Sequence, residues 1–99
     1  MATYEAQSTG IKGETDIVVR TGIAVVPAGW QNMTAEKAAE RNWLVGRISF
    51  DKGQYRVTSY AQQTFQREDW EKNTSGAFRS YDEAFAWIVS ECNNVLERL

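Results

Sequence analysis

Residues 44–62 contain two runs of alternating apolar and polar side chains, separated by Lys52-Gly53. A glycine-containing dipeptide between two such runs is typical of a tight β-hairpin turn. The turn predicts a register that gathers the apolar side chains on one face, with these pairs: Phe50 with Tyr55, Ile48 with Val57, Gly46 with Ser59 and Leu44 with Ala61. A longer loop that begins at Asp51 and includes a glycine bulge is the alternative.

The opposite face of this hairpin would carry mostly polar side chains. It would hold three pairs: Val45 with Tyr60, Arg47 with Thr58 and Ser49 with Arg56. A register shifted by one residue would turn both arginines into the core, where an unpaired charge is costly. The alternation therefore favours the register given above.

A second strong pattern predicts an amphipathic helix over residues 81–97. Ser80 and Glu83 have the spacing of a capping box, with Ser80 as the N-cap. Apolar residues then recur with a period of 3.6 along one stripe: Tyr81, Ala84, Phe85, Ile88, Cys92, Val95, Leu96 and Leu99. We expect this helix to pack over the apolar face of the hairpin and to bury Cys92 as a small, unreactive side chain.

The N-terminal half of the chain gives weaker signals. Residues 1–15 are interpreted as a flexible arm or an edge strand. Residues 16–26 are rich in Val and Ile and predict one strand bent at Gly22; a tight turn at Thr21-Gly22 between two short strands is the alternative. Thr34 is the predicted N-cap of a short helix that follows.

These elements together predict an α+β fold in the order β-α-β-β-α. We expect a small, single-layer antiparallel or mixed sheet with two helices packed on one face. A right-handed crossover helix would join the first strand to residues 44–51. Residues 63–79 would be a long connection, because their apolar positions fit neither period. Residues 16–99 would form a single domain.

The residue types that most catalysis needs are nearly absent from this sequence. It contains no histidine and a single cysteine, which removes Ser-His and Cys-His pairs, structural zinc clusters and disulfides. Phosphate-binding glycine loops are also absent. Adjacent carboxylates such as Glu68-Asp69 are interpreted as a solvated loop, and Asp82-Glu83 as part of a helix start. We therefore expect no enzymatic activity, no cofactor and no metal.

Charge and hydropathy also limit where the protein acts. The formal net charge is −2, which is neither the basic excess of a strong nucleic-acid binder nor the acidic excess of a DNA mimic. No apolar run approaches the ~20 residues of a membrane span, and no secretory signal is recognised at the start. We therefore expect a cytoplasmic protein that does not contact a membrane.

The outer face of the predicted hairpin is the first candidate binding site, because aromatic and arginine side chains supply many binding hot spots. The candidate residues are Trp43, Val45, Arg47, Arg56, Thr58 and Tyr60, together with Trp70 in the long connection. The alternative is that residues 63–79 or the N-terminal arm cover this face, so that Trp43 and Tyr60 belong to a small second core. Trp87 is interpreted as a flank of the core.

The sequence thus favours a non-catalytic, protein-binding module, an adaptor or an inhibitor of a larger protein machine. Small domains of this kind occur among phage and mobile-element proteins that act on host machinery, a comparison that rests on size and composition alone. The alternative is a nucleic-acid binder that uses the basic and aromatic face of residues 44–62. A homodimer is left open.

Overall fold

The computed structural model describes residues 2–23, 26, 32–65 and 73–98. Five strands form one antiparallel sheet in the order β1-β2-β3-β4-β5. The strands are β1 (Thr3–Ser8), β2 (Glu14–Arg20), β3 (Trp43–Asp51), β4 (Gln54–Ser59) and β5 (Asn73–Phe78). The helices are α1 (Ala35–Glu40), α2 (Ala61–Phe65) and α3 (Tyr81–Glu97). The predicted α+β class is confirmed.

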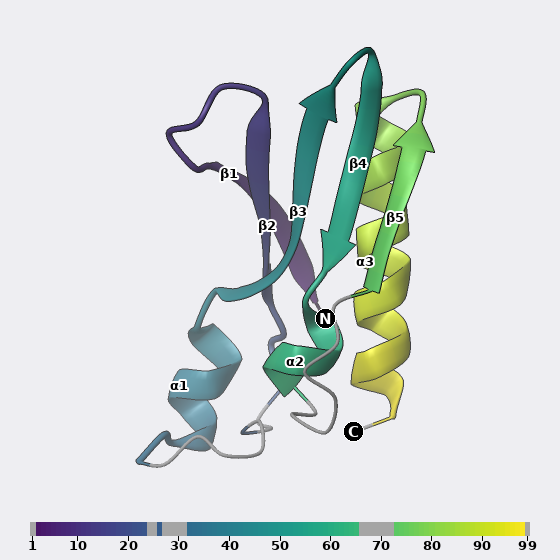
Figure 1. Ribbon diagram of the computed structural model, residues 1–99. Helices are drawn as coiled ribbons and strands as arrows, with labels where there is room; N and C mark the ends of the chain where they lie inside the picture. Colours follow the sequence, from purple (N-terminus) through teal and green to yellow (C-terminus); the bar gives the residue numbers. More distant parts are fainter. Residues whose placement is uncertain (1, 24–25, 27–31, 66–72, 99) are drawn as a thin grey trace.

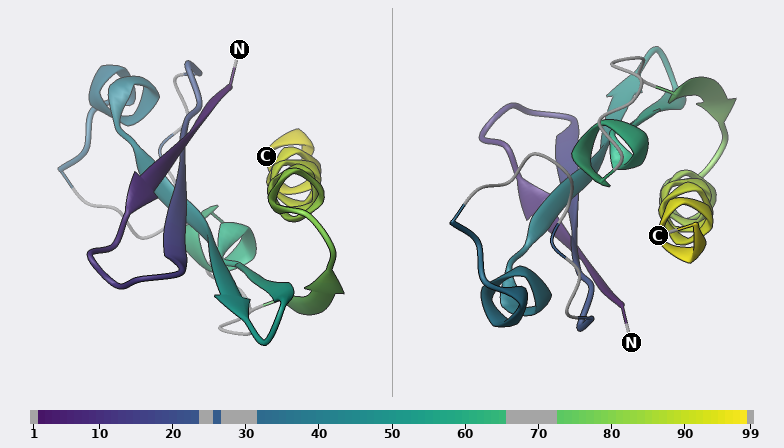
Figure 2. Two further views of the ribbon diagram at one scale, coloured as in Figure 1. Left: turned by 90° about the horizontal axis from the view of Figure 1, so that it is seen from above. Right: turned by 90° about the horizontal axis from the view of Figure 1, so that it is seen from below.

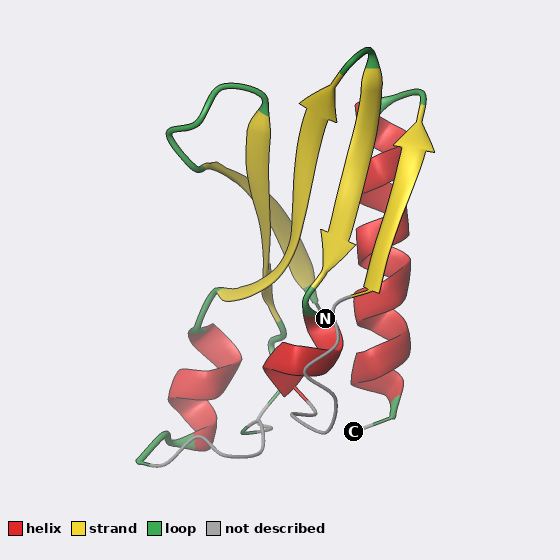
Figure 3. Ribbon diagram, in the orientation of Figure 1, coloured by secondary structure: helices red, strands yellow, loops and turns green. Residues whose placement is uncertain are grey.

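The sheet and the long helix α3 form two layers (Figure 1). The sheet curves around α3, which contacts β3, β4 and β5 (Figure 2). The far edge strand β1 reaches α3 as well, because the Tyr4 hydroxyl donates a hydrogen bond to Asn93 Oδ1. The shorter helices α1 and α2 lie near one end of the sheet (Figure 3). One face of the sheet is therefore packed against α3.

The hairpin of β3 and β4 has the register that the sequence predicts from Gly46 to Asp51. Lys52 and Gly53 have φ of 51° and 77°, the pair of positive values that a two-residue type I′ turn requires. The predicted pairing of Leu44 with Ala61 is wrong, because β4 ends at Ser59 and Ala61 begins α2.

The predicted N-caps of α1 and α3 are confirmed. Thr34 Oγ1 accepts a hydrogen bond from the Lys37 N–H, and Ser80 Oγ accepts one from the Glu83 N–H. These bonds satisfy backbone donors that the first turn of a helix cannot pair internally.

The predicted crossover between the first strand and residues 44–51 is wrong, because β2 and β3 pair antiparallel. A crossover must carry the chain back along the whole length of a strand, whereas the six residues of α1 span only about 9 Å. The single bent strand over residues 16–26 is also wrong in its bounds. β2 ends at Arg20, and Gly22 follows it with a φ of 67°.

Two other segments contain more regular structure than the sequence predicts. Within residues 1–15, the edge-strand interpretation is the one the structure supports, as β1. Residues 63–79 are not a plain connection, because α2 extends to Phe65 and β5 begins at Asn73. In β5 the backbone pairs with β4, so the strand is stabilised by its neighbour in the sheet.

A β-bulge interrupts β3 where it pairs with β2. Ile17 pairs with Gly46, but the next residue, Val18, pairs with Leu44, so that Val45 has no counterpart. The extra residue reverses the alternation of side chains on the N-terminal side of the bulge. Trp43 and Val45 consequently join the core, where they are 2% and 0% exposed, and Leu44 lies on the other face, 39% exposed.

The core lies between α3 and the inner face of the sheet. From α3 it receives Ala84, Ile88, Cys92 and Val95, and from the sheet Ile17, Val19, Trp43, Val45, Ile48 and Val57. Ala38, Ala61 and Phe65 close it at the end of the sheet where α1 and α2 lie. Trp43 connects these parts, because its Nε1 donates to the Ala38 carbonyl at 3.0 Å and its ring lies 5.8 Å from that of Phe65.

Cys92 is fully buried, as predicted. Burial raises the pKa of its thiol from 9.0 to about 11, and a hydrogen bond with Tyr4 offsets part of this rise. At a pH between these two pKa values, the thiol of the unfolded chain has lost its proton, whereas the thiol of the folded chain keeps it. The unfolded state then binds fewer protons, so the free energy of unfolding falls as pH rises from about 9 to about 11.

We therefore expect the wild type to lose more stability than Cys92→Ala over this range, by up to about 2–3 kcal/mol. Urea denaturation of both proteins at pH 7, 9 and 11 measures the difference, and the ionisable groups that do not interact with Cys92 cancel between them. Burial and the hydrogen bond with Cys92 both raise the pKa of Tyr4, so the difference reports the Cys92–Tyr4 pair. Parallel pH profiles would contradict the prediction. So would complete labelling of the native thiol within minutes at pH 8.

Candidate functional site

The side of the sheet that faces away from α3 is called the outer face here. In Figure 1 it is turned toward the reader over β3, β4 and β5, with α3 behind. No helix of the described part of the chain covers it. The pairing of the strands places these residues on it: Glu5, Gln7, Glu14, Asp16, Val18, Arg20, Leu44, Arg47, Ser49, Asp51, Gln54, Arg56 and Thr58.

An apolar centre lies on the outer face where β2 meets β3. Val18 and Leu44 pair directly. Val18 is only 6% exposed although it does not belong to the core under α3, whereas Leu44 remains 39% exposed. An exposed leucine beside a second apolar side chain, on a sheet face that no described helix covers, is a starting point for docking.

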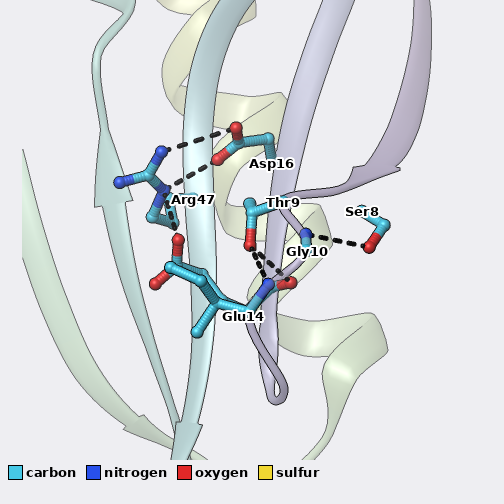
Figure 4. A network of polar contacts seen from close by, with 7 residues as sticks. Ser8, Thr9, Gly10, Glu14, Asp16 and Arg47 are labelled. Carbon is cyan, nitrogen blue, oxygen red and sulfur yellow. Dashed lines mark hydrogen bonds and ion pairs between the residues drawn. The ribbon is translucent and has the colours of Figure 1, made fainter.

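Arg47 forms the polar centre of the outer face (Figure 4). Its Nε lies 2.7 Å from Asp16 Oδ1 and its Nη2 lies 3.4 Å from Asp16 Oδ2. The guanidinium therefore donates two hydrogen bonds to this carboxylate. The Nε also lies 3.3 Å from Glu14 Oε1. The hydrogen bond to Asp16 raises the pKa of Arg47 above its usual value. The three side chains form a cluster with one negative charge in excess.

The loop between β1 and β2 supports this cluster. Ser8 Oγ accepts a hydrogen bond from the Gly10 N–H (Figure 4), and Thr9 Oγ1 accepts one from the Ile11 N–H. Such short side-chain bonds fix a turn locally. The Phe50 N–H also donates to the Gly13 carbonyl at 2.7 Å, which ties the loop to β3. Glu14 therefore follows a turn that is fixed at several points.

The structure brings together some of the predicted site residues and separates others. Arg47, Arg56 and Thr58 do share the outer face: Arg47 is opposite Thr58, and Arg56 is exposed opposite Ser49. Tyr60 is half-buried and close enough to Arg47 to contribute to its raised pKa.

Trp43 and Val45 do not belong to this face, because the bulge at Val45 turns both side chains into the core. Trp70 lies outside the described residues. Trp87 is half-buried against the core, 6.2 Å from the ring of Phe78, in agreement with its interpretation as a flank.

The sequence reasoning missed the contributions of β2 to this site. Glu14, Asp16 and Val18 reach the outer face because β2 pairs antiparallel with β3. A signal was present, since Glu14, Asp16 and Val18 alternate with Thr15, Ile17 and Val19. This alternation predicts a strand that begins at Glu14 with the carboxylates on one side.

Two other surface features are weaker candidates. At the tip of the β3–β4 hairpin, the ring of the half-exposed Phe50 lies 4.7 Å from that of Tyr55 and is tilted against it by 55°. At the other end of the molecule, a shallow pocket of about 230 Å³ has this lining: Ala2, Thr21, Ile23, Asn93, Leu96 and Glu97. Neither feature brings together charged groups or a recognisable set of ligands.

Within the described residues, no group of three or more His, Cys, Asp or Glu side chains is placed to hold a metal ion. None of the helices in the described ranges combines the length and the apolar character needed to cross a membrane. No protein-family model, curated protein or solved structure matches this chain.

Proposed function

We propose that this chain is a non-catalytic protein-binding module that docks through the outer face of its sheet. The observation that carries the proposal is the exposed Leu44 beside Val18, on a sheet face that no described helix covers. Protein interfaces commonly combine such an apolar centre with a polar rim. The proposal places the module in the cytoplasm, where a lone buried thiol such as Cys92 stays reduced.

The polar rim of this face is suited to a protein partner. The side chains of Arg47, Asp16 and Glu14 are already held by one another, so ordering them on binding costs little side-chain entropy. Arg56 is exposed and adds a second guanidinium to the face. Arginine is enriched at interfaces because its planar head can pair with carboxylates and also pack on apolar groups.

Nucleic acid is a less well supported partner for the same face. It carries four carboxylates (Glu5, Glu14, Asp16 and Asp51) and three guanidinium groups (Arg20, Arg47 and Arg56). A phosphate backbone would meet this mixed field with little net attraction. Nuclease treatment therefore belongs in the binding test.

The test is to replace Leu44 with glutamate and to capture partners from a lysate of the native cell with tagged protein. We expect the wild type to retain a protein partner after nuclease treatment and at high salt. We expect Leu44→Glu to reduce capture at least about tenfold, because a carboxylate would be desolvated at the centre of the interface.

Phe50→Glu is the matched control, because Phe50 is a 50% exposed apolar residue on the same strand, at its other end and on the face opposite to Leu44. It should capture as well as the wild type, and circular dichroism should show both variants folded. Equal capture by Leu44→Glu and the wild type would contradict the proposed site. Complete loss of the captured material after nuclease treatment would favour nucleic acid.

A further inference from the structure

We infer that the occupant of the outer face is a second copy of this chain, packed outer face to outer face about a two-fold axis parallel to β3. The inference rests on the proposed function only in taking the outer face as the docking surface. Three properties of the face support it: the order of charges across the strands, the position of Leu44, and the unbalanced charge around Arg47.

The charges run from acidic to basic across one row of the sheet. Glu14 on β2 is opposite Ser49 on β3, which is opposite Arg56 on β4. A two-fold axis along β3 turns the second copy over, so that its β4 lies above β2 of the first. Glu14 then faces Arg56 of the second copy, and Arg56 faces its Glu14. The row is thus complementary to itself, with Ser49 at the centre.

The apolar residues match under the same operation. Leu44 lies on β3, close to the axis, so the two copies of this exposed side chain meet each other. Val18, beside it on β2, is only 6% exposed and adds little to this contact. The exposed surface of the Leu44 side chain is therefore removed from water in both copies when the dimer forms.

Arg47 also lies on β3, so its two copies approach each other across the axis. Each guanidinium is already neutralised by Asp16 and Glu14, at 2.7 Å and 3.3 Å from its Nε. The cluster has one carboxylate in excess, and Arg56 of the second copy supplies the missing positive charge. Pairing through Arg56 therefore balances a charge that burial would otherwise leave uncompensated.

The size of the face indicates a weak, reversible dimer. Four strands ~4.8 Å apart and about six residues long, at ~3.3 Å per residue, cover roughly 400 Å² of plan area per copy. The two copies together would bury about 800 Å², which is below the ~1,000 Å² that a stable specific interface usually exceeds. The dimer should form at high protein concentration and dissociate on dilution.

Charge reversal tests the arrangement in two single variants, Glu14→Arg and Arg56→Glu. Sedimentation of the untagged full chain from about 10 µM to about 1 mM should show the wild type shifting from monomer to dimer. Each variant alone places like charges opposite each other twice, and should dimerise at least about tenfold more weakly. An equimolar mixture should dimerise like the wild type, because a heterodimer of the two variants again pairs opposite charges at both positions.

If the mixture dimerises like the wild type, the weak dimerisation of each single variant cannot be due to misfolding. Each chain in the mixture still carries its own substitution, so a folding defect would persist there. Arg79→Glu, a charge reversal at an exposed residue between β5 and α3, is the matched control and should dimerise like the wild type. A wild type that is monomeric throughout the range would overturn the inference, as would a mixture that does not recover. If that monomer still captures another protein through Leu44, the proposed function stands and the second copy is excluded.

Discussion

Trp43→Ala is expected to lower the free energy of unfolding by about 3–5 kcal/mol, the usual cost of removing a large buried aromatic side chain. Trp43 is 2% exposed and packs against Phe65. The guanidinium of Arg41 lies 5.0 Å from the centre of its ring. The substitution also removes the donor to the Ala38 carbonyl and leaves a cavity between the sheet, α1 and α2. Urea denaturation followed by circular dichroism measures the loss.

Trp43→Phe separates the two contributions, because it keeps an apolar ring but has no N–H to donate. It should cost about 1–3 kcal/mol, with the Ala38 carbonyl left without this partner. A stability change below about 0.5 kcal/mol in Trp43→Ala would be typical of a surface residue. Such a small change would indicate that the Trp43 side chain lies on the outer face, which is the position that the alternation along β3 alone predicts.

The parts of the fold that the sequence predicts correctly are those set by local interactions. The hairpin register follows from the turn at Lys52-Gly53, whose two residues take positive φ. The bounds of α3 follow from its cap at Ser80 and its apolar stripe. In both cases the decisive residues lie within a few positions of one another, so the pattern can be read without knowing the rest of the chain.

The bulge at Val45 could not be predicted in this way. The alternation along β3 was derived from its pairing with β4, which is regular from Gly46 onward. The bulge arises from the other neighbour, β2, and a strand of correct composition gives no sign of one unpaired residue. This single residue explains why Trp43 and Val45 were assigned to the wrong face.

The strands β1 and β5 were missed or uncertain for a related reason. Asn73–Phe78 contains only Thr74 and Phe78 among the residue types that are enriched in strands, and it becomes a strand through its pairing with β4. Arg47, Arg56 and Thr58 were grouped correctly because one hairpin carries all three. The β2 half of the site depends on a pairing between residues about 30 positions apart, which a local pattern does not reveal.

Gly46→Val is expected to destabilise the protein by about 2–3 kcal/mol through overpacking between β3 and α3. A Cβ atom at Gly46 would lie 2.6 Å from Ile88 Cγ2 and 2.8 Å from Ile88 Cδ1, far inside van der Waals contact. Ile88 is fully buried and belongs to the stripe that packs α3 on the sheet, so it has no free space into which to move. The added side chain must therefore push the helix and the strand apart.

Ile88→Ala provides the complementary test, because it removes the three atoms that the new side chain would meet. Alone it should cost about 2–5 kcal/mol by leaving a cavity. In the double variant the valine at position 46 fills part of that cavity, so the combined loss should be at least about 1 kcal/mol smaller than the sum of the two single losses. Ser49→Val, on the outer face of the same strand, is the control and should change stability by no more than about 0.5 kcal/mol. Additive losses in the urea midpoints would mean that Gly46 and Ile88 do not touch, and that α3 does not lie on β3 at this point.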